Sequence, residues 1–271
     1  MVAWRQKPFL LGAYPWYALG ILLTAVVWEL AAMALGPYRL PSLGTVTSQL
    51  FPLLTSSKTL EFQGGGSQGY WPHLLHTISF TLFSSFTGVI TGVAFGLAMA
   101  RFKPIRAISE VPIELLRTIP PLAAVPFILI WIGPGDAAQI MMVSYYVFVV
   151  MVVTTLNATI NVNPIVATFA ATLGAKENRI FRTVIFPAML PTVVGGVRVA
   201  VGIAWSVQIV AELMGGRYGM GRAFSAMISF QALDAIIVGI IWLALIAAIV
   251  DAVLVVFIRR VTRWAPTTRK L

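Results

Sequence analysis

Hydrophobic residues occur in long continuous runs along this chain and do not alternate with polar residues. A run of about 20 residues can cross the roughly 30 Å hydrocarbon core of a bilayer as one α-helix. Strands of a membrane barrel would alternate instead, so the pattern favours helices. Six runs are long enough, at about residues 14–36, 78–100, 111–132, 137–160, 191–213 and 233–258. We therefore expect an all-α membrane protein with about six transmembrane helices, in a single transmembrane domain over residues 1–271.

Composition agrees with this fold class, because 59% of the residues are hydrophobic and the mean hydropathy is +0.89. The first run contains Glu29 and lacks a small-residue cleavage site after a short apolar core. We therefore expect a retained helix there and not a signal peptide. The chain has no cysteine, which excludes disulfides and thiolate metal sites.

Lysine and arginine are distributed unevenly between the segments that join the runs. If the N-terminus is inside, 13 of the 19 basic residues lie on inner segments and 4 on outer segments. The positive-inside rule then predicts that both termini are cytoplasmic. The net charge of +10 follows from this topology and requires no nucleic-acid partner.

The segment 161–190 lies between two runs on the inner side and is basic and amphipathic. Asn163 and Pro164 predict a helix start, Gly174 predicts its end, and a second short helix is expected from about Lys176 to Pro187. Two interpretations remain open for this segment. It either fills a groove on another protein with its apolar side chains or lies on anionic lipid.

The segment 37–76 is the longest outer loop. Leu40-Pro41-Ser42 and the apolar residues that follow predict a short surface helix with Ser42 near its N-cap. Residues 61–70 have the glycine-rich composition of a linker.

Prolines are concentrated near the third run, at Pro120, Pro121, Pro126 and Pro134. They indicate either a moving or pore-lining region or a simple kink. Acidic residues within runs are costly and need partners or water. Glu212 is a candidate for a translocation pathway, or else it binds the backbone of Gly215-Gly216 at the outer helix end. Asp251 is expected to be a structural or interface acid.

No catalytic constellation is present. The chain lacks a Gly-x-x-x-x-Gly-Lys-Ser/Thr phosphate loop, so it is not expected to hydrolyse ATP. His73 and His76 could share a helical face, but no His-Glu-x-x-His motif exists and no metal or cofactor site is predicted.

The segment 161–190 resembles the cytoplasmic loop of ABC importer permeases, whose pattern is Glu-Ala-Ala, three residues, Gly, nine residues, then Ile-x-Leu-Pro. Here Thr168-Phe169-Ala170, Gly174, Val184, Phe186 and Pro187 fall on that pattern, with Thr168 in place of the glutamate. The chain is similar in particular to the nitrate, taurine and aliphatic-sulfonate branch. The residues that carry this similarity are Leu40-Pro41-Ser42, Arg117 to Ala123, Leu173-Gly174-Ala175, Pro187 to Pro191, Gly196-Val197-Arg198, Trp205 and Val210 to Leu213.

The resemblance implies a type I importer fold in a prokaryotic cell membrane, with a second permease copy, two ABC ATPase subunits that bind ATP and Mg, and an extracytoplasmic binding protein. The residues expected to dock the ATPase are Thr168, Phe169, Ala170, Gly174, Ala175, Lys176, Arg179, Phe181 and Pro187. The residues expected along the translocation pathway are Arg117, Pro120, Pro121, Arg198, Ser206, Gln208 and Glu212. The expected cargo is a small solute, in particular an anion such as nitrate, sulfonate, taurine or bicarbonate.

Two other classes compete with this interpretation. A self-sufficient ion-coupled transporter or channel predicts a relay of intramembrane acids and an inverted repeat. The chain offers three scattered acids, and we find no obvious repeat. An intramembrane enzyme would need a nucleophile, base or metal set that the sequence does not provide.

Overall fold

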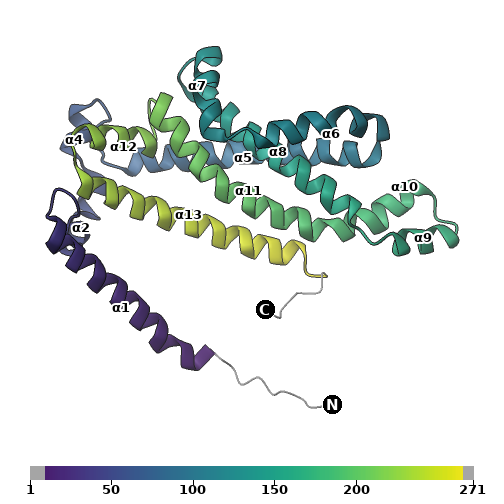
Figure 1. Cartoon of the computed structure of the whole chain (residues 1–271), viewed down its shortest axis with the longest axis horizontal. Helices are drawn as coiled ribbons and strands as arrows, with labels where there is room; N and C mark the ends of the chain where they lie inside the picture. The colour runs from purple at the N-terminus through teal and green to yellow at the C-terminus, as the bar shows by residue number, and fades with distance from the viewer. Residues whose placement is uncertain (1–9, 265–271) are drawn as a thin grey trace. The chain divides into compact units, whose positions relative to one another are not determined.

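The computed structural model describes residues 10–264, and the side chains from residue 15 onward. Over this range the chain consists of helices and connecting loops (Figure 1). The helices are α1 (Leu10–Leu35), α2 (Leu43–Gln49), α3 (Pro52–Thr55), α4 (Lys58–Phe62), α5 (Trp71–Arg101), α6 (Lys103–Thr118), α7 (Pro121–Ile132), α8 (Asp136–Ile160), α9 (Pro164–Thr172), α10 (Glu177–Ile180), a π-helical turn (Phe181–Ile185), α11 (Phe186–Gly215), α12 (Met220–Ser229) and α13 (Leu233–Val261).

Five helical stretches among the described residues are long and apolar enough to cross a membrane, and a bent pair of helices brings the number to as many as six. The expected all-α membrane fold with about six spans is therefore confirmed. The described residues divide into two compact units, one up to residue 69 together with 226–241 and the other of residues 70–225 together with those from 242 onward. The second unit contains the helices α5 to α11.

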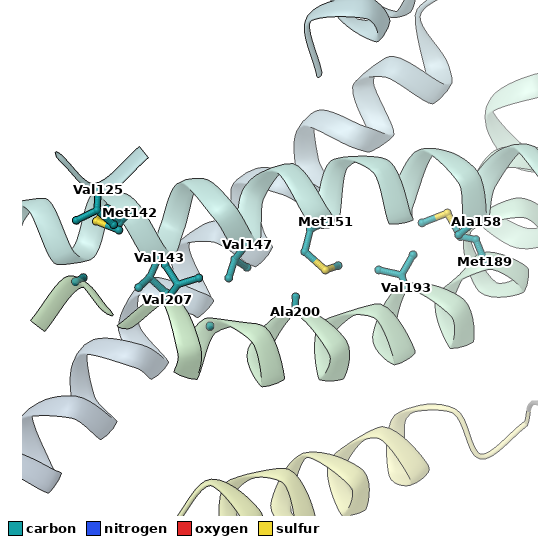
Figure 2. Packing of buried hydrophobic residues seen from close by; sticks show 12 residues of the cluster. Val125, Met142, Val143, Val147, Met151, Ala158, Met189, Val193, Ala200 and Val207 are labelled. Atoms are coloured by element: carbon teal, nitrogen blue, oxygen red, sulfur yellow. The ribbon is translucent and has the colours of Figure 1, made fainter. Parts of the chain in front are cut away.

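Helix α8 forms the centre of the second unit, where it packs against both α5 and α11 (Figure 1). Between α8 and α11 lies an apolar core of fully buried side chains (Figure 2). Val143, Val147 and Met151 of α8 face Val193 and Ala200 of α11 there.

The contact between α5 and α8 depends on three glycines of α5 that are spaced four residues apart. A Cβ atom added to Gly92 would lie 2.7 Å from both the Cβ of Met151 and the carbonyl oxygen of Phe148. Added Cβ atoms at Gly88 and Gly96 would collide in the same way with α8, at 2.6 Å and 2.8 Å from its nearest atoms. Residues four apart lie on one helix face, so the backbones of α5 and α8 meet closely along two full turns.

The predicted span at 111–132 is divided in the structure into α6 and α7, which meet at an angle of 101°. Helix α6 ends at Thr118, and Ile119 and Pro120 both have extended backbone conformations. A proline disfavours the helical conformation of the residue before it, which explains why the break falls at Ile119. Pro121 then begins α7, where a missing N–H costs nothing.

The first unit fixes α1 to the start of the outer segment. Glu29 accepts a hydrogen bond from the backbone N–H of Leu43 at 3.0 Å, and the indole of Trp28 donates to the carbonyl of Pro41 at 3.0 Å. The predicted N-cap at Ser42 is confirmed, because its hydroxyl accepts from the N–H of Thr45. The intramembrane acid Glu29 therefore has a partner at the N-terminus of α2, where a negative charge is favoured.

We expect the substitution Gly92→Ala to destabilise the protein by about 1–3 kcal/mol, because one methyl group overpacks the α5–α8 contact. Gly195→Ala is the matched control, since an added Cβ at Gly195 has no atom within 4 Å. Alanine is favoured over glycine in a helix by about 1 kcal/mol, so the control should be neutral or stabilising. Thermal unfolding of the detergent-solubilised protein measures both, and equal melting temperatures for Gly92→Ala and wild type would contradict the packing argument.

Candidate functional site

Helix α9 has both of its ends fixed by local hydrogen bonds. At the start, the side-chain oxygen of Asn163 accepts from the N–H of Ile165, and Pro164 occupies the first helical position. At the end, Gly174 has a φ of +82°, and its N–H donates to the carbonyl of Ala171 at 2.9 Å. The N–H of Ala175 donates to the carbonyl of Ala170 at 3.1 Å, which completes a Schellman motif. The predicted start and end of this helix are both confirmed.

The apolar face of α9 is uncovered. The exposed fractions of Ile165, Phe169 and Leu173 are 71%, 65% and 74%. These residues are four apart and therefore lie on one face. Exposed clusters of large apolar side chains mark surfaces that bind a protein or a membrane.

The second half of segment 161–190 differs from the expectation. Pro187 does not end a short helix, because α10, the π-helical turn and α11 follow one another without a break over Glu177–Gly215. Pro187 therefore lies within a continuous helix, with only Phe186 between it and the π-helical turn. The π-helical turn directly before it widens the backbone at the residues that the proline ring approaches.

The residues expected to dock a partner are distributed over α9, the turn and α10. Five of them are exposed, namely Thr168, Phe169, Gly174, Lys176 and Arg179, whereas Ala170, Ala175, Phe181 and Pro187 are partly buried. The hydroxyl of Thr168 donates to the carbonyl of Pro164 at 3.0 Å. Glu177 lies 3.4 Å from Arg101 at the end of α5, so an ion pair connects the loop to the bundle.

A pocket of about 720 Å³ lies beside α9, and the polar residues of its lining include Asn157, Asn161, Thr183 and Thr192. A second pocket of about 300 Å³ is mostly apolar and lies among α7, α8 and α11. Pro121, Tyr146 and Ser206 contribute to its lining.

One face of α11 is exposed along most of the helix and carries small and polar residues beside Val199. Gly195, Arg198, Gly202 and Ser206 lie on it, and an added Cβ at either glycine has no atom within 4 Å. Arg198 forms a bidentate ion pair with Asp251 of α13.

Arg117, another residue expected along the pathway, is exposed at the end of α6 and lies 2.9 Å from Glu114. Pro120 is exposed at the break between α6 and α7.

Glu212, by contrast, is fully buried at the other end of α11. Its carboxylate lies 2.9 Å from the hydroxyl of Thr77 on α5, and it accepts from Gln208 at 2.8 Å and from the N–H of Gly221 at 2.9 Å. Gln208 is buried as well and donates to Gln139 of α8 at 3.0 Å. Glu212 and Gln208 therefore connect α5, α8, α11 and the start of α12 inside the bundle.

The two histidines lie next to Glu212. His73 is fully buried and its Nδ1 accepts from the N–H of Gly219 at 3.2 Å. The Nδ1 of His76 lies 3.5 Å from Glu212, and its Nε2 lies 3.8 Å from Asp136. Gly219 has a φ of +105°, and an added Cβ there would overlap the Glu212 carboxylate.

Comparison with known families identifies the architecture that these elements form. The family model for the inner membrane component of binding-protein-dependent transport systems matches residues 86–263. The chain belongs to this family. It is the membrane permease of an ABC transport system and not its ATPase, in a multi-pass inner-membrane location.

Several curated relatives resemble nearly the whole permease. The taurine transport system permease protein TauC of Escherichia coli K12 is 30% identical, over 91% of this chain and 87% of the relative. The putative aliphatic sulfonates transport permease protein SsuC of Bacillus subtilis 168 is 26% identical, over 93% and 88%. The nitrate import permease protein NrtB of Synechocystis PCC 6803 is 23% identical, over 86% and 84%.

Solved structures agree on the fold. A permease chain of the inward-facing MetNI methionine ABC transporter matches with a TM-score of 0.58 and 19% identity, over 70% of this chain and 94% of that chain. A chain of an amino acid ABC transporter matches with a TM-score of 0.58 and 18% identity, over 78% of this chain and all of that chain. The predicted type I importer permease fold is confirmed.

Some residues that organise this permease were not anticipated from the sequence. Thr77 and Gly221 bind Glu212, although only the adjacent Gly215-Gly216 backbone was expected as its partner. The glycines at 215, 216, 219 and 221 were a usable signal, because such a density predicts a backbone that approaches another group closely. Nothing in the local sequence indicated that Thr77, 135 residues away, is the partner.

We expect Glu212→Ala to lower the free energy of unfolding of the permease by about 1–3 kcal/mol or more, because it leaves buried donors without an acceptor. Thr77→Val should be less than additive with it, because both changes remove the same hydrogen bond. Glu177→Ala is the control, since Glu177 is 85% exposed and its surface ion pair contributes little. Thermal unfolding of the four variants in detergent measures the coupling, and strict additivity would contradict a direct Thr77–Glu212 bond.

Proposed function

We propose that this permease imports a small anion that an extracytoplasmic binding protein delivers, in an assembly of two permease copies and two ABC ATPase subunits. ATP and Mg bind to the ATPase subunits. The observation that carries the proposal is the uncovered apolar face of α9, which lies in an inner loop within the region that matches the family model. The orientation follows from the distribution of basic residues, which places residues 161–190 inside and residues 37–76 outside.

Docking of an ATPase on α9 uses a known recognition mode, in which the apolar face of a short helix fills a groove on another protein. Phe169 and Leu173 supply the apolar contacts, while Lys176 and Arg179 add charge at one end. The alternative, in which α9 lies on lipid, does not explain why both ends of the helix are fixed by hydrogen bonds. If the ATPase moves α9, the helix must keep a defined shape. The Asn163 cap and the Gly174 turn provide that shape.

Movement of α9 reaches the bundle through its two flanking helices. On one side it follows α8, and on the other it leads through α10 and the π-helical turn into α11 without a helical break. A displacement imposed on the loop by the ATPase therefore moves α11 against α8. We propose that this movement alternates access to a pathway along the exposed face of α11, in the manner of rigid-element transitions.

The pathway proposal includes Arg117, Pro120, Pro121, Arg198 and Ser206, which are exposed or line the apolar pocket. Gln208 and Glu212 support it from inside the bundle by holding α5, α8 and α11 together. An anionic cargo agrees with the names of the relatives, because taurine, aliphatic sulfonates and nitrate all carry an oxyanion group. Arginine is well suited to such groups.

The proposal predicts that the tagged permease, isolated from membranes in mild detergent, brings with it an ATPase that contains a phosphate loop. Mass spectrometry of the isolated material identifies it, and a binding protein found with it would supply candidate cargo. Isolation of the permease alone, with import intact after reconstitution without ATP, would instead favour an ion-coupled transporter or a channel.

Substitution of Gly174 tests the docking surface. Gly174→Val should abolish import and reduce recovery of the ATPase, because a β-branched residue does not adopt the φ of +82° that ends α9. Gly174→Asn is the matched control, since asparagine tolerates this conformation, and it should retain most of the import. Unchanged import by Gly174→Val, at normal membrane levels, would contradict the docking proposal.

A further inference from the structure

The ion pair between Arg198 and Asp251 lies in an unusual position for charged groups. Arg198 lies seven residues, about 10 Å, inside the inner end of the expected span 191–213, and therefore within a hydrocarbon core of about 30 Å. The Nε of Arg198 lies 2.6 Å from Oδ1 of Asp251, and its Nη2 lies 2.7 Å from Oδ2. The side chains remain 52% and 43% exposed within this chain.

Lipid does not explain this exposure. Charged side chains within transmembrane segments are costly and almost always face a bundle interior or a water-filled cavity. The other exposed residues near Asp251 on α13, such as Ile249, Val253 and Phe257, are large and apolar, as expected of a surface in lipid. The ion pair therefore faces water or protein, and not acyl chains.

The face of α11 that carries Arg198 differs from the exposed part of α13, because it carries small and polar residues, although Val199 is also exposed there. Gly195 and Gly202 are exposed there, and nothing in this chain requires them to be small. Ser206 lies on the same face and also lines the apolar pocket among α7, α8 and α11. Small residues that no neighbour contacts leave space beside the helix, and Arg198 borders that space.

We propose that Asp251 is a selectivity residue that competes with the transported anion for the guanidinium of Arg198. This inference rests on the proposed function, because it assigns an anionic cargo to the α11 face. The guanidinium presents two parallel N–H groups that match the two oxygens of a carboxylate, a sulfonate or a nitrate. The anion replaces Asp251 on Arg198 during passage, and Asp251 returns when the anion leaves.

A competing carboxylate explains how an anion bound to Arg198 is released again during transport. An unpaired arginine in a narrow, poorly hydrated pathway would attract an anion and then retain it. Passage requires a contact that is favourable enough for entry and weak enough for release. Asp251 weakens the contact between Arg198 and the anion, because each anion must displace a bidentate partner that is already in place. Asp251 thus belongs to the pathway together with Arg198.

The competing explanation is that the pair only joins α11 to α13, or contacts a second permease copy, without meeting the cargo. Exchanging the charges separates these explanations, since Arg198→Asp with Asp251→Arg keeps the pair but moves the guanidinium to α13. Arg106 and Glu110 of α6 form the matched control pair, which is also bidentate, with both distances 3.1 Å, and also about half exposed. Exchanging their charges should leave import unchanged.

The experiment uses the complete complex, isolated with its own ATPase and binding protein and reconstituted in proteoliposomes. ATP-dependent uptake of isotope-labelled taurine, ethanesulfonate and nitrate is measured, together with retention of the same anions by the purified complex in equilibrium dialysis. We expect Asp251→Asn to reduce the maximal uptake rate about tenfold and to raise anion retention about tenfold, because Arg198 loses its competitor. The exchanged pair and the double variant Arg198→Gln/Asp251→Asn should lose uptake and retain no anion, in complexes of normal composition.

If the wild-type complex imports an anion and the exchanged pair imports it normally, the selectivity role of Asp251 is overturned. The proposed function is then unaffected. Unchanged anion retention by Asp251→Asn would also overturn the selectivity role. If the wild-type complex imports none of the anions, the anionic cargo and the role of Asp251 fail together. Loss of uptake confined to the Arg198 and Asp251 variants, with the Arg106–Glu110 exchange active, supports the inference.

Discussion

The close contact between α5 and α8 is the constraint on which the rest of this permease depends. Gly88, Gly92 and Gly96 bring the two backbones together over two turns, where any side chain larger than hydrogen would collide. Lipid offers no hydrophobic driving force between helices, so the stability of such a contact comes from dense packing and from interhelical hydrogen bonds, such as the one between Thr87 and Ser144. With α5 fixed on one side of α8, the opposite side is free to carry α11, the helix that bears the proposed pathway and continues into the inner loop.

Polar groups fix the other end of the same bundle. Glu212 is buried among Thr77, Gln208 and Gly221, and it joins three helices through hydrogen bonds that leave no room for a side chain at Gly219. Breaking these hydrogen bonds would leave buried polar groups unpaired at a large cost, so the network resists displacement of the helices that it joins. The outer end of α11 is therefore held, while its inner end is attached to a loop with an uncovered face. In the proposed transport cycle, displacement of the inner end of α11 would therefore tilt the helix about its fixed outer end.

The sequence predicted those features that depend on neighbours along the chain. Ser42, Asn163 and Gly174 have the capping roles expected of them, because a cap is determined by residues within one helical turn. The number of spans followed from hydropathy, whereas the helices at 71–101 and 177–215 are longer than their apolar runs. The expectation that Pro187 ends a helix was wrong, because the π-helical turn before it accommodates the proline ring within a continuous helix, and the sequence alone did not indicate that turn.

Features that depend on distant segments could not be predicted. The glycine spacing at 88, 92 and 96 was visible, but its partner surface on α8 was not, because small residues allow many helix pairs. Likewise Glu212 and Asp251 were both recognised as acids that need partners, yet their environments are opposite. Glu212 is enclosed and has several donors, whereas Asp251 has a single arginine and remains exposed. An acid with many fixed donors maintains a structure, whereas an acid with one exposed partner can exchange it, and this difference separates the scaffold of the permease from its proposed pathway.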